Sequence, residues 1–185
     1  FIFLLEKIPP PSDEDIAARV IRKSMTKMER KNFFHRFRFG LILLIIIYVF
    51  LTIFRDIRDN FAADIWRELG FGNQPSVFTA TEIPITIIVL VLIGSMILIR
   101  NNRKAFFITH LIIITGFLIA GASSWLFIHH AITPFAWMTL VGLGLYMGYI
   151  PFNCILFDRL IATFKHAGNV GFLMYVADSF GYLGS

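Results

Sequence analysis

Charged and polar side chains stand inside apolar runs of this sequence, and they are the first candidates for chemistry. The clearest is Asp178, which lies well inside an apolar run that begins at Gly168. A carboxyl group surrounded by hydrocarbon is costly, so it needs a partner or a function. The helical spacing places Asp178 on one polar face together with Tyr175, Ser179 and Tyr182. Two interpretations stay open for this face. Asp178 is satisfied by hydroxyl groups or by an arginine of another helix, or it is a protonatable group in a cavity that couples proton movement to a solute.

A second group of charges runs from Arg55 to Asp59, directly after a long apolar run. That run is shorter than the ~20 residues that cross a bilayer, so the charges are predicted to lie in the outer part of the membrane. Arg55 and Asp59 are four positions apart and are predicted to pair, with Arg58 on the same side. One interpretation is a self-neutralised cluster at the outer boundary, with Trp66 as an anchor in the interface. The other is a wet cavity in which Arg55 or Arg58 meets an anionic group or gates the outer mouth.

The fourth apolar run contains the features of a broken helix. Gly144 and Gly148 have the spacing that lets another helix approach closely. Pro151 removes a backbone donor and is predicted to kink the helix near Tyr149. Because transporters place ligand sites at broken helices near the middle of the membrane, Tyr149 and Asn153 are candidate cavity residues.

Other polar residues have structural explanations. Asp158 and Arg159 stand at the predicted cytoplasmic end of the fourth run and are expected to dock neighbouring helix ends as a gate-type pair. Glu82 is explained as part of a helix start capped by a nearby threonine. The histidines do not form a ligand set, and none of the common nucleophile, phosphate-loop or metalloprotease motifs occurs. The sequence therefore predicts no enzyme, no metal site and no cofactor.

The elements that must position these residues are membrane-crossing helices. Hydrophobic residues make up 57% of the sequence and the mean hydropathy is +0.72, whereas soluble domains have about 45–50% apolar residues. The fold class is predicted to be all-α, a polytopic transmembrane bundle. Its expected spans cover about residues 39–60, 82–100, 104–128, 132–158 and 168–185.

The basic residues predict how this bundle is oriented. Most of the 17 lysines and arginines fall in residues 6–38, 100–104 and 158–167, which are alternate connections between the runs. Because basic residues concentrate in cytoplasmic loops, these three connections are predicted to lie inside. The net charge of +5 then indicates attraction to the anionic inner leaflet, and nucleic acid is not expected as a partner.

The two ends of the sequence indicate a piece of a larger bundle. Residues 1–5 are interpreted as the end of a preceding transmembrane helix, and residues 6–38 as a cytoplasmic connector with an amphipathic helix between Pro9 and Asn32. Residues 39–185 are interpreted as a bundle truncated at both ends. An N-terminal half of the same chain is therefore an expected partner, together with the lipid bilayer.

The stretches YIPFNCILFDRLIATFK and GNVGFLMYVADSFGYLG resemble an uncharacterised bacterial family, of the type found in Bacteroidetes, that is similar to the major facilitator superfamily. The strings PPPSDEDIA and RDIRDN carry the same resemblance. It implies a segment from the end of helix six to helix eleven of a twelve-helix fold. Helices seven and ten would line the cavity, which assigns Arg55 and Arg58 to seven, Asn153 to ten and Asp178 to eleven. The turn at residues 100–104 departs from the gating motif of many facilitators, because it lacks the glycine and aspartate.

The sequence thus predicts an integral membrane transporter of major facilitator type in the bacterial inner membrane. It would move a small solute, with paired arginines hinting at an anion, by alternating access. The alternative is a membrane sensor or scaffold with the same kind of bundle, in which the basic connector docks a partner.

Overall fold

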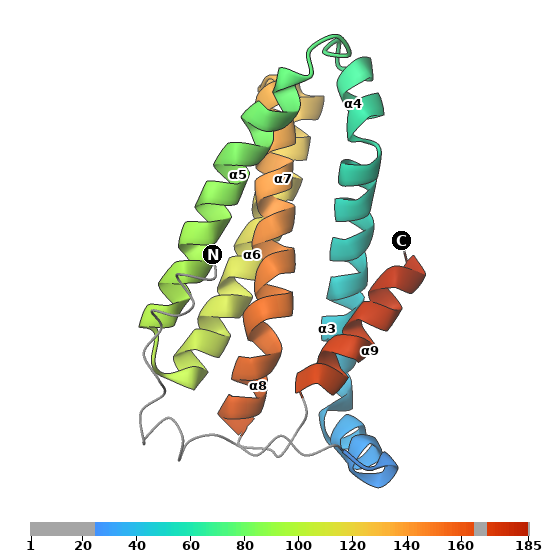
Figure 1. The fold of residues 1–185 in the computed structure, drawn as a ribbon, viewed down its shortest axis with the longest axis vertical. Coiled ribbons are helices and arrows are strands. Elements are labelled where there is room, and N and C mark those ends of the chain that lie inside the picture. The colour runs from blue at the N-terminus through green and yellow to red at the C-terminus, as the bar shows by residue number, and fades with distance from the viewer. Residues whose placement is uncertain (1–24, 165–169, 185) are drawn as a thin grey trace, which may run out of the picture.

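The computed structural model describes residues 25–164 and 170–184, and every regular element in these ranges is a helix. The predicted residues 1–5 and most of the predicted connector 6–38 lie outside the described residues. Figure 1 shows the helices, which in chain order are α3 (Lys27–Asn60), α4 (Ala62–Glu68), α5 (Ser76–Ser95), the 3-10 helix η1 (Met96–Leu98), α6 (Asn102–Ile128), α7 (Pro134–Pro151), the π-helix η2 (Phe152–Leu156), α8 (Phe157–Phe164) and α9 (Val170–Gly184).

Four helical segments are long and apolar enough to cross a membrane. The shortest, Ser76–Leu98, has 23 residues, and a rise of 1.5 Å per residue makes it long enough for a hydrocarbon core of about 30 Å. The prediction of an all-helical membrane protein is therefore confirmed. The fifth predicted span is described from Val170 to Gly184, where α9 has 15 residues. The four segments are Lys27–Asn60, Ser76–Leu98, Asn102–Ile128 and Pro134–Phe164.

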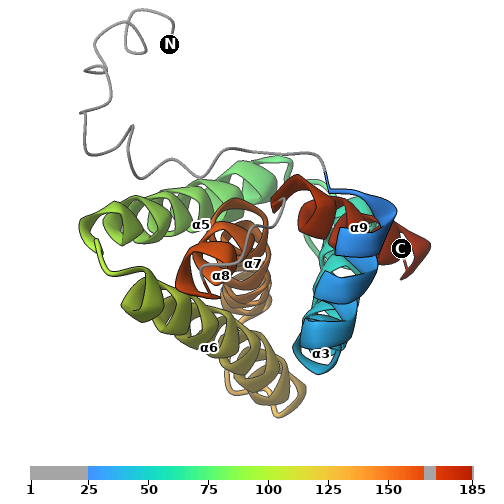
Figure 2. The ribbon, with the colours of Figure 1, turned by 90° about the horizontal axis from the view of Figure 1, so that it is seen from below.

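Helix α3 begins well before the apolar run that predicted it. Thr26 caps the helix by accepting a hydrogen bond from the Glu29 backbone, and the Glu29 carboxylate accepts one from the Thr26 backbone at 2.7 Å. This reciprocal capping satisfies donors that the first turn leaves unpaired. The last residues of the predicted amphipathic stretch, Lys27–Asn32, are therefore continuous with the membrane helix. The first turns of α3, in blue, lie oblique to the rest of the helix (Figures 1 and 2).

Helix α7 lies at the centre of the bundle, with α5 on one side, α3 on the other and α6 behind (Figures 1 and 2). In the segment Pro134–Phe164, which begins with α7, 50% of the most apolar stretch is buried inside the protein, compared with 17% in α6. The outer face of α6 is a stripe of exposed apolar side chains at helical spacing. Such a face suits acyl chains rather than water. The stripe consists of Phe107, Leu111, Ile114, Leu118 and Trp125.

Glycines allow α6 and α7 to cross at close range. A Cβ atom on Gly116 of α6 would meet the carbonyl oxygen of Gly144 in α7, and a Cβ on Gly144 would meet the carbonyl oxygen of Gly116. One turn further along α7, Gly148 faces the side chain of Leu51 in α3, 2.6 Å from the position of a Cβ. Gly144 and Gly148 therefore hold α7 against two different neighbours, which is the use of small residues in membrane helix packing.

The α-helical pattern of the fourth span ends at Pro151. The next five residues, Phe152–Leu156, form the π-helix η2, and α8 continues to Phe164. Proline removes one backbone donor, and a π-segment accommodates the mismatch by adding a residue to one turn. The break is the one that the sequence predicts, but it takes the form of a π-turn that begins just after Pro151.

The Gly116–Gly144 crossing yields the first testable prediction. In Gly116→Ala the added methyl group meets a backbone oxygen, so α6 and α7 must separate. We expect the free energy of unfolding to fall by about 1–3 kcal/mol, as for overpacked cores. Thermal unfolding in detergent measures this change.

The matched control is Gly94→Ala in α5, because a Cβ at Gly94 meets nothing within 4 Å. Alanine is the better helix former, so this control should unfold at the same temperature as the unmodified protein or higher. Equal melting of the two variants would contradict the close crossing.

Candidate functional site

A buried tyrosine joins three helices in the interior of the bundle. Tyr48 of α3 is 1% exposed, and its hydroxyl donates to Oδ1 of Asp178 in α9 at 2.6 Å. The Tyr48 hydroxyl oxygen also lies 3.2 Å from the side-chain oxygen Oδ1 of Asn153 in η2. A phenol has a single proton, so the second contact is satisfied when the Asn153 amide presents its N–H2 group to the phenol oxygen. We call Tyr48, Asn153, Asp178 and Tyr149, which stacks on Tyr48, the Tyr48 cluster.

Each member of the Tyr48 cluster is positioned by a local feature of its helix. Asp178 approaches α3 because the facing side of α9 is small: Ala177 is buried, and a Cβ on Gly181 would lie 2.8 Å from the Tyr48 ring. Asn153 lies in the π-turn, where the wider helix changes the direction of its side chains. The predicted cavity residues Asn153 and Asp178 are therefore brought together, through a tyrosine that the sequence analysis did not select.

The ring of Tyr149 connects this cluster to the charges at the other end of α3. It stacks on Tyr48 with 5.7 Å between the centroids and 16° between the planes. The guanidinium carbon of Arg55 lies 4.0 Å from the centroid of Tyr149, a cation–π contact. The carboxylate paired with Arg55 is Asp56. The predicted pair of Arg55 with Asp59 is therefore wrong, because tertiary contacts draw the two side chains to other partners.

Asp59 belongs to a second group of polar residues centred on Arg58. The Arg58 guanidinium is bonded to Asp59 at 3.0 Å and to Glu82 of α5 at 2.6 Å, and it also donates to the backbone oxygen of Met138. Tyr146 of α7 donates to the second oxygen of Asp59 at 2.7 Å. We call Arg58, Asp59, Glu82 and Tyr146 the Arg58 cluster.

Arg58 fits this position because α7 presents no side chain there. It is 5% exposed, and its guanidinium occupies the place that a Cβ on Gly142 would take. A buried guanidinium needs carboxylates and further acceptors around it, and the cluster supplies two carboxylates and one carbonyl. The cluster therefore ties α3, α5 and α7 together, which is more than the self-neutralised boundary group predicted from residues 55–59 alone.

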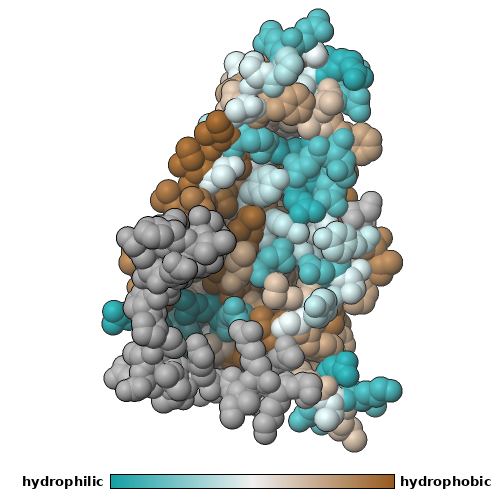
Figure 3. Space-filling view, viewed as in Figure 1, coloured by the Kyte–Doolittle hydropathy of each residue, from teal (hydrophilic) through white to brown (hydrophobic). Residues whose placement is uncertain are grey.

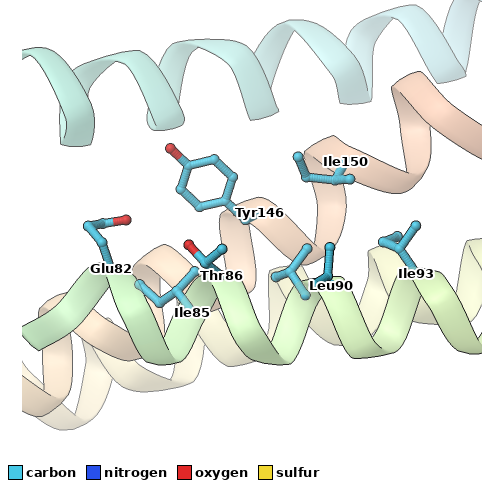
Figure 4. A pocket seen from close by; sticks show the side chains of 8 residues that line it. Glu82, Ile85, Thr86, Leu90, Ile93, Tyr146 and Ile150 are labelled. Atoms are coloured by element: carbon cyan, nitrogen blue, oxygen red, sulfur yellow. The ribbon is translucent and has the colours of Figure 1, made fainter. Parts of the chain in front are cut away.

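The explanation of Glu82 as part of a helix start is wrong. Helix α5 begins at Ser76, so Glu82 lies a full turn or more inside it, and Thr81 bonds its own helix backbone at Val77 and Phe78. Glu82 and Tyr146 also line a pocket of about 310 Å³ between α5 and α7. In Figure 4 the Tyr146 hydroxyl points from α7 toward α3, and Ile85, Leu90 and Ile150 form apolar walls of the pocket.

The two clusters follow each other along the contact between α3 and α7. With Arg55 and Asp56, they contain two arginines and four carboxyl groups, and both arginines are paired with carboxylates. In Figure 3 the hydrophilic residues gather over the α3 side of the upper half, while hydrophobic residues cover the edge formed by α5. The site therefore holds more carboxyl groups than arginines.

The remaining candidates of the polar face on α9 do not join either cluster. Tyr175, Ser179 and Tyr182 are exposed, and the Ser179 hydroxyl donates to the backbone oxygen of Tyr175. Only Asp178 of this face points at α3. The face is polar, as its spacing predicts, but within the described residues it borders open space and not a neighbouring helix.

Asp158 and Arg159, the expected gate-type pair, have different surroundings. At the other end of the bundle, Arg159 donates to the side chain of Asn102 at the start of α6, so it does dock a neighbouring helix end, whereas its neighbour Asp158 is exposed.

Trp66 is 2% exposed and packs with Val77 and Met138. It is therefore part of the protein interior, and its interpretation as an interface anchor is wrong.

The sequence analysis did not select Tyr48 or Tyr146, and it gave Glu82 only a structural explanation. Tyr48 stands in an apolar run, where the neighbouring residues do not distinguish a functional tyrosine from an aromatic side chain of the core. The available signal was its spacing of seven residues to Arg55, which places both on one face of α3. Glu82 carried a signal of its own, because an unpaired carboxylate in an apolar run requires a partner.

The family model described as "Family of unknown function (DUF5690)" matches residues 1–185. The chain belongs to this family. No curated protein and no solved structure matches the chain. For this member of DUF5690, function must therefore be argued from the two clusters and from the bundle that holds them.

The Arg58 cluster gives a second testable prediction. Replacing both carboxylates, in Asp59→Asn with Glu82→Gln, leaves the buried guanidinium without a counter-charge. We expect the double variant to lose about 3–5 kcal/mol of stability, the cost of an uncompensated buried charge. Each single variant keeps one carboxylate and should lose much less. Chemical unfolding of the four proteins in detergent gives these free energies.

Asp64→Asn is the control, because Asp64 pairs with Arg67 on the surface of α4. Loss of that exposed pair should cost about 0–1 kcal/mol. A double variant whose loss merely equals the sum of the two single losses would contradict the shared role of the carboxylates.

Proposed function

We propose that the protein is a transporter of the major facilitator type, which moves a small solute across the bacterial cytoplasmic membrane by alternating access. The observation that carries this proposal is the line of polar residues between α3 and α7. Charged and hydroxyl-bearing side chains follow one another from Asp178 and Tyr48 to Glu82, inside a bundle whose outer face is apolar. Ionisable groups at such positions in membrane proteins mark pathways for solutes or protons.

The broken span supports the same function. Asn153 lies in the π-turn η2, and Tyr149 lies just before Pro151, so the polar line crosses the helix where its regular hydrogen bonding is interrupted. Transporters use such breaks both to bind ligands and to let one part of a helix move relative to the other. In the proposed mechanism, α7 and α8 tilt about this break while α6 and the Gly116–Gly144 crossing move with α7.

Asp178 is the proposed coupling group. When it is ionised, the phenol of Tyr48 donates to it and α9 is held on α3. When it is protonated, the carboxylic acid no longer needs that donor, and the contact between the two helices weakens. Because the carboxyl groups outnumber the arginines, a proton or another cation is the proposed co-transported species.

The ends of the bundle would act as the gates. Near one end, the Arg58 cluster binds α3, α5 and α7 together, and near the other Arg159 is bonded to Asn102 at the start of α6. The exposed polar face of α9 is proposed to border the solute cavity. The basic connections would lie in the cytoplasm, as the positive-inside rule implies.

The alternative is a membrane sensor or scaffold that uses the same bundle without moving a solute. Both functions accept an apolar exterior and a paired interior. They differ in what the polar line does: a scaffold needs Asp178 only as a contact, whereas a transporter needs it to change protonation.

A flux measurement with Asp178→Asn tests the proposal. The full-length protein is placed in liposomes that contain a pH-sensitive dye, and solutes from four groups, namely sugars, amino acids, carboxylates and organic cations, are added outside. We expect at least one solute to drive proton movement, and we expect Asp178→Asn to abolish it. The amide cannot carry a proton but can still accept the Tyr48 hydrogen bond, so the protein should remain folded.

Asp64→Asn makes the same chemical change at an exposed position and should keep full flux. Tyr48→Phe keeps the ring but removes the donor to Asp178, and it should lower the flux without abolishing proton binding at Asp178. Folded protein without solute-dependent proton movement for any solute, or unchanged flux in Asp178→Asn, would count against the transporter and favour the scaffold.

A further inference from the structure

Another pocket lies at the end of the bundle where α3 and α6 begin. It has a volume of about 590 Å³ and opens between α3, α6 and α8, which is within the roughly 300–1,000 Å³ typical of ligand sites. Its polar lining is basic and consists of His35, Arg36, Arg38 and His110, while the rest of its wall is apolar. None of the acidic residues in the described part of the chain lines it. We call this space the Arg36 pocket.

The guanidinium groups of Arg36 and Arg38 are open to a ligand. Both residues are exposed, and within residues 25–164 and 170–184 no carboxylate is bonded to either of them. Arg36 lies 5.9 Å from the centroid of the Phe37 ring, a contact that leaves its N–H groups free. Arg55 and Arg58, in contrast, are paired with carboxylates. The two arginines of the pocket are therefore available to an anion from outside the bundle, which their N–H groups can bind.

An apolar groove continues from these arginines along α3. Arg36, Gly40 and Ile47 follow one another at intervals of four and seven residues, which places them on one face of the helix. Gly40 has no side chain, and a Cβ there would meet nothing within 4 Å, so the groove is open at this point. Beside it, Phe39 is 77% exposed and Leu43 is 45% exposed. The pocket therefore joins a cationic end to an exposed apolar groove.

The position of the pocket along α3 indicates which anion would reach it. Arg36 and Arg38 directly precede the apolar run that begins at Phe39, and the segment Lys27–Asn60 is long and apolar enough to cross a membrane. The arginines therefore lie near the boundary between headgroups and hydrocarbon, and the groove beyond them lies in hydrocarbon. A free phosphate would bind the arginines but leave the groove empty. A phospholipid supplies the phosphate and an acyl chain in one molecule.

We propose that the Arg36 pocket binds one anionic phospholipid of the inner leaflet, with its phosphate bonded to Arg36 and Arg38 and one acyl chain lying over Gly40. Basic pockets between transmembrane helices on the cytoplasmic side suit such headgroups, and this end of the bundle is the one that the basic connections predict to be cytoplasmic. The site depends on the membrane location of the bundle but not on transport, so it stands or falls separately from the proposed function.

Quenching by labelled lipids tests the site in the full-length protein. A fluorophore is attached to Phe107→Cys in a background without other cysteines, because Phe107 is exposed and its ring lies 6.1 Å from that of the pocket residue Phe106. The protein is placed in phosphatidylcholine liposomes that contain phosphatidylglycerol or phosphatidylcholine with a nitroxide on the acyl chain. We expect labelled phosphatidylglycerol to quench at a much lower mole fraction, with each arginine contributing a preference of about fivefold.

Variants of the arginines separate the pocket from general attraction of this end to anionic lipid. Arg36→Gln and Arg38→Gln should each lower the preference for phosphatidylglycerol about fivefold, and the double variant should remove it. Arg103→Gln is the matched control, because Arg103 is exposed near the start of α6 but does not line the pocket. It should keep the preference of the unmodified protein.

Gly40→Leu tests the groove while leaving both arginines in place. The open space at Gly40 can accept the side chain, so the variant should fold, which its thermal unfolding verifies, and it should lose most of the excess quenching by phosphatidylglycerol. Gly94→Leu is the matched control, because Gly94 is equally open but lies in α5 beside a different pocket. It should leave the quenching unchanged.

Four results would overturn the proposal. Equal quenching by the two labelled lipids would mean that the pocket does not select an anionic headgroup. Equal losses in Arg103→Gln and Arg36→Gln would assign the preference to the general charge of this end. Undiminished quenching in folded Gly40→Leu would place the acyl chain elsewhere. Loss of the excess quenching on addition of millimolar inorganic phosphate would show that the pocket binds the free anion and not a lipid.

Discussion

Hydrocarbon offers no hydrogen bonds, and this constraint decides how the polar residues of the chain are arranged. In water, Arg55, Arg58 and Asp178 could each be solvated separately. In a bilayer each must find partners in the protein, because an isolated charge there costs several kcal/mol. The three residues lie on α3 and α9, and all are turned toward α7 or α3. The apolar stripe of α6, on the far side of α7, meets the opposite requirement.

Glycines are the physical means by which the bundle meets this constraint. Gly142 makes room for the Arg58 guanidinium, Gly181 lets α9 approach Tyr48, and Gly116 and Gly144 bring α6 and α7 into contact. A side chain at any of these positions would separate helices whose polar groups must touch. Interhelical hydrogen bonds in membranes are individually modest, about 0.6–2 kcal/mol. The close packing that the glycines permit is therefore as important to the site as the hydrogen bonds themselves.

Much of the fold could be predicted from the sequence because each helix carries its own signal. Long apolar runs, the Pro151 break and the spacing of Gly144 and Gly148 are local features, and each corresponds to an observed one. The predicted boundaries were less accurate. α3 continues back to Lys27 because Thr26 and Glu29 form a cap that the apolar run does not reveal, and α5 begins at Ser76, ahead of the predicted start near residue 82.

The partners within the site could be predicted only in part, because they depend on which helices meet. The spacing of Arg55 and Asp59 favoured a pair within one helix, but Tyr149 and Tyr146 of α7 draw the two side chains apart. Glu82 had a plausible local explanation, yet its partner is 24 residues away in sequence. Tyr48 reads as one more aromatic of an apolar run until α9 brings Asp178 to its hydroxyl.

The pocket between α5 and α7 and the outer face of α6 must meet different surroundings, and electron paramagnetic resonance can measure this directly. Spin labels are placed, in a Cys154→Ser background, at Thr86 in the pocket beside Tyr146 and at Leu118 on the outer face of α6. The protein is reconstituted in liposomes, and collisions with a water-soluble nickel complex and with oxygen are compared. We expect the label at position 86 to be reached by nickel and the label at position 118 to be reached mainly by oxygen. Nickel access at position 118 with none at position 86 would contradict both the membrane arrangement and the polar line inside it.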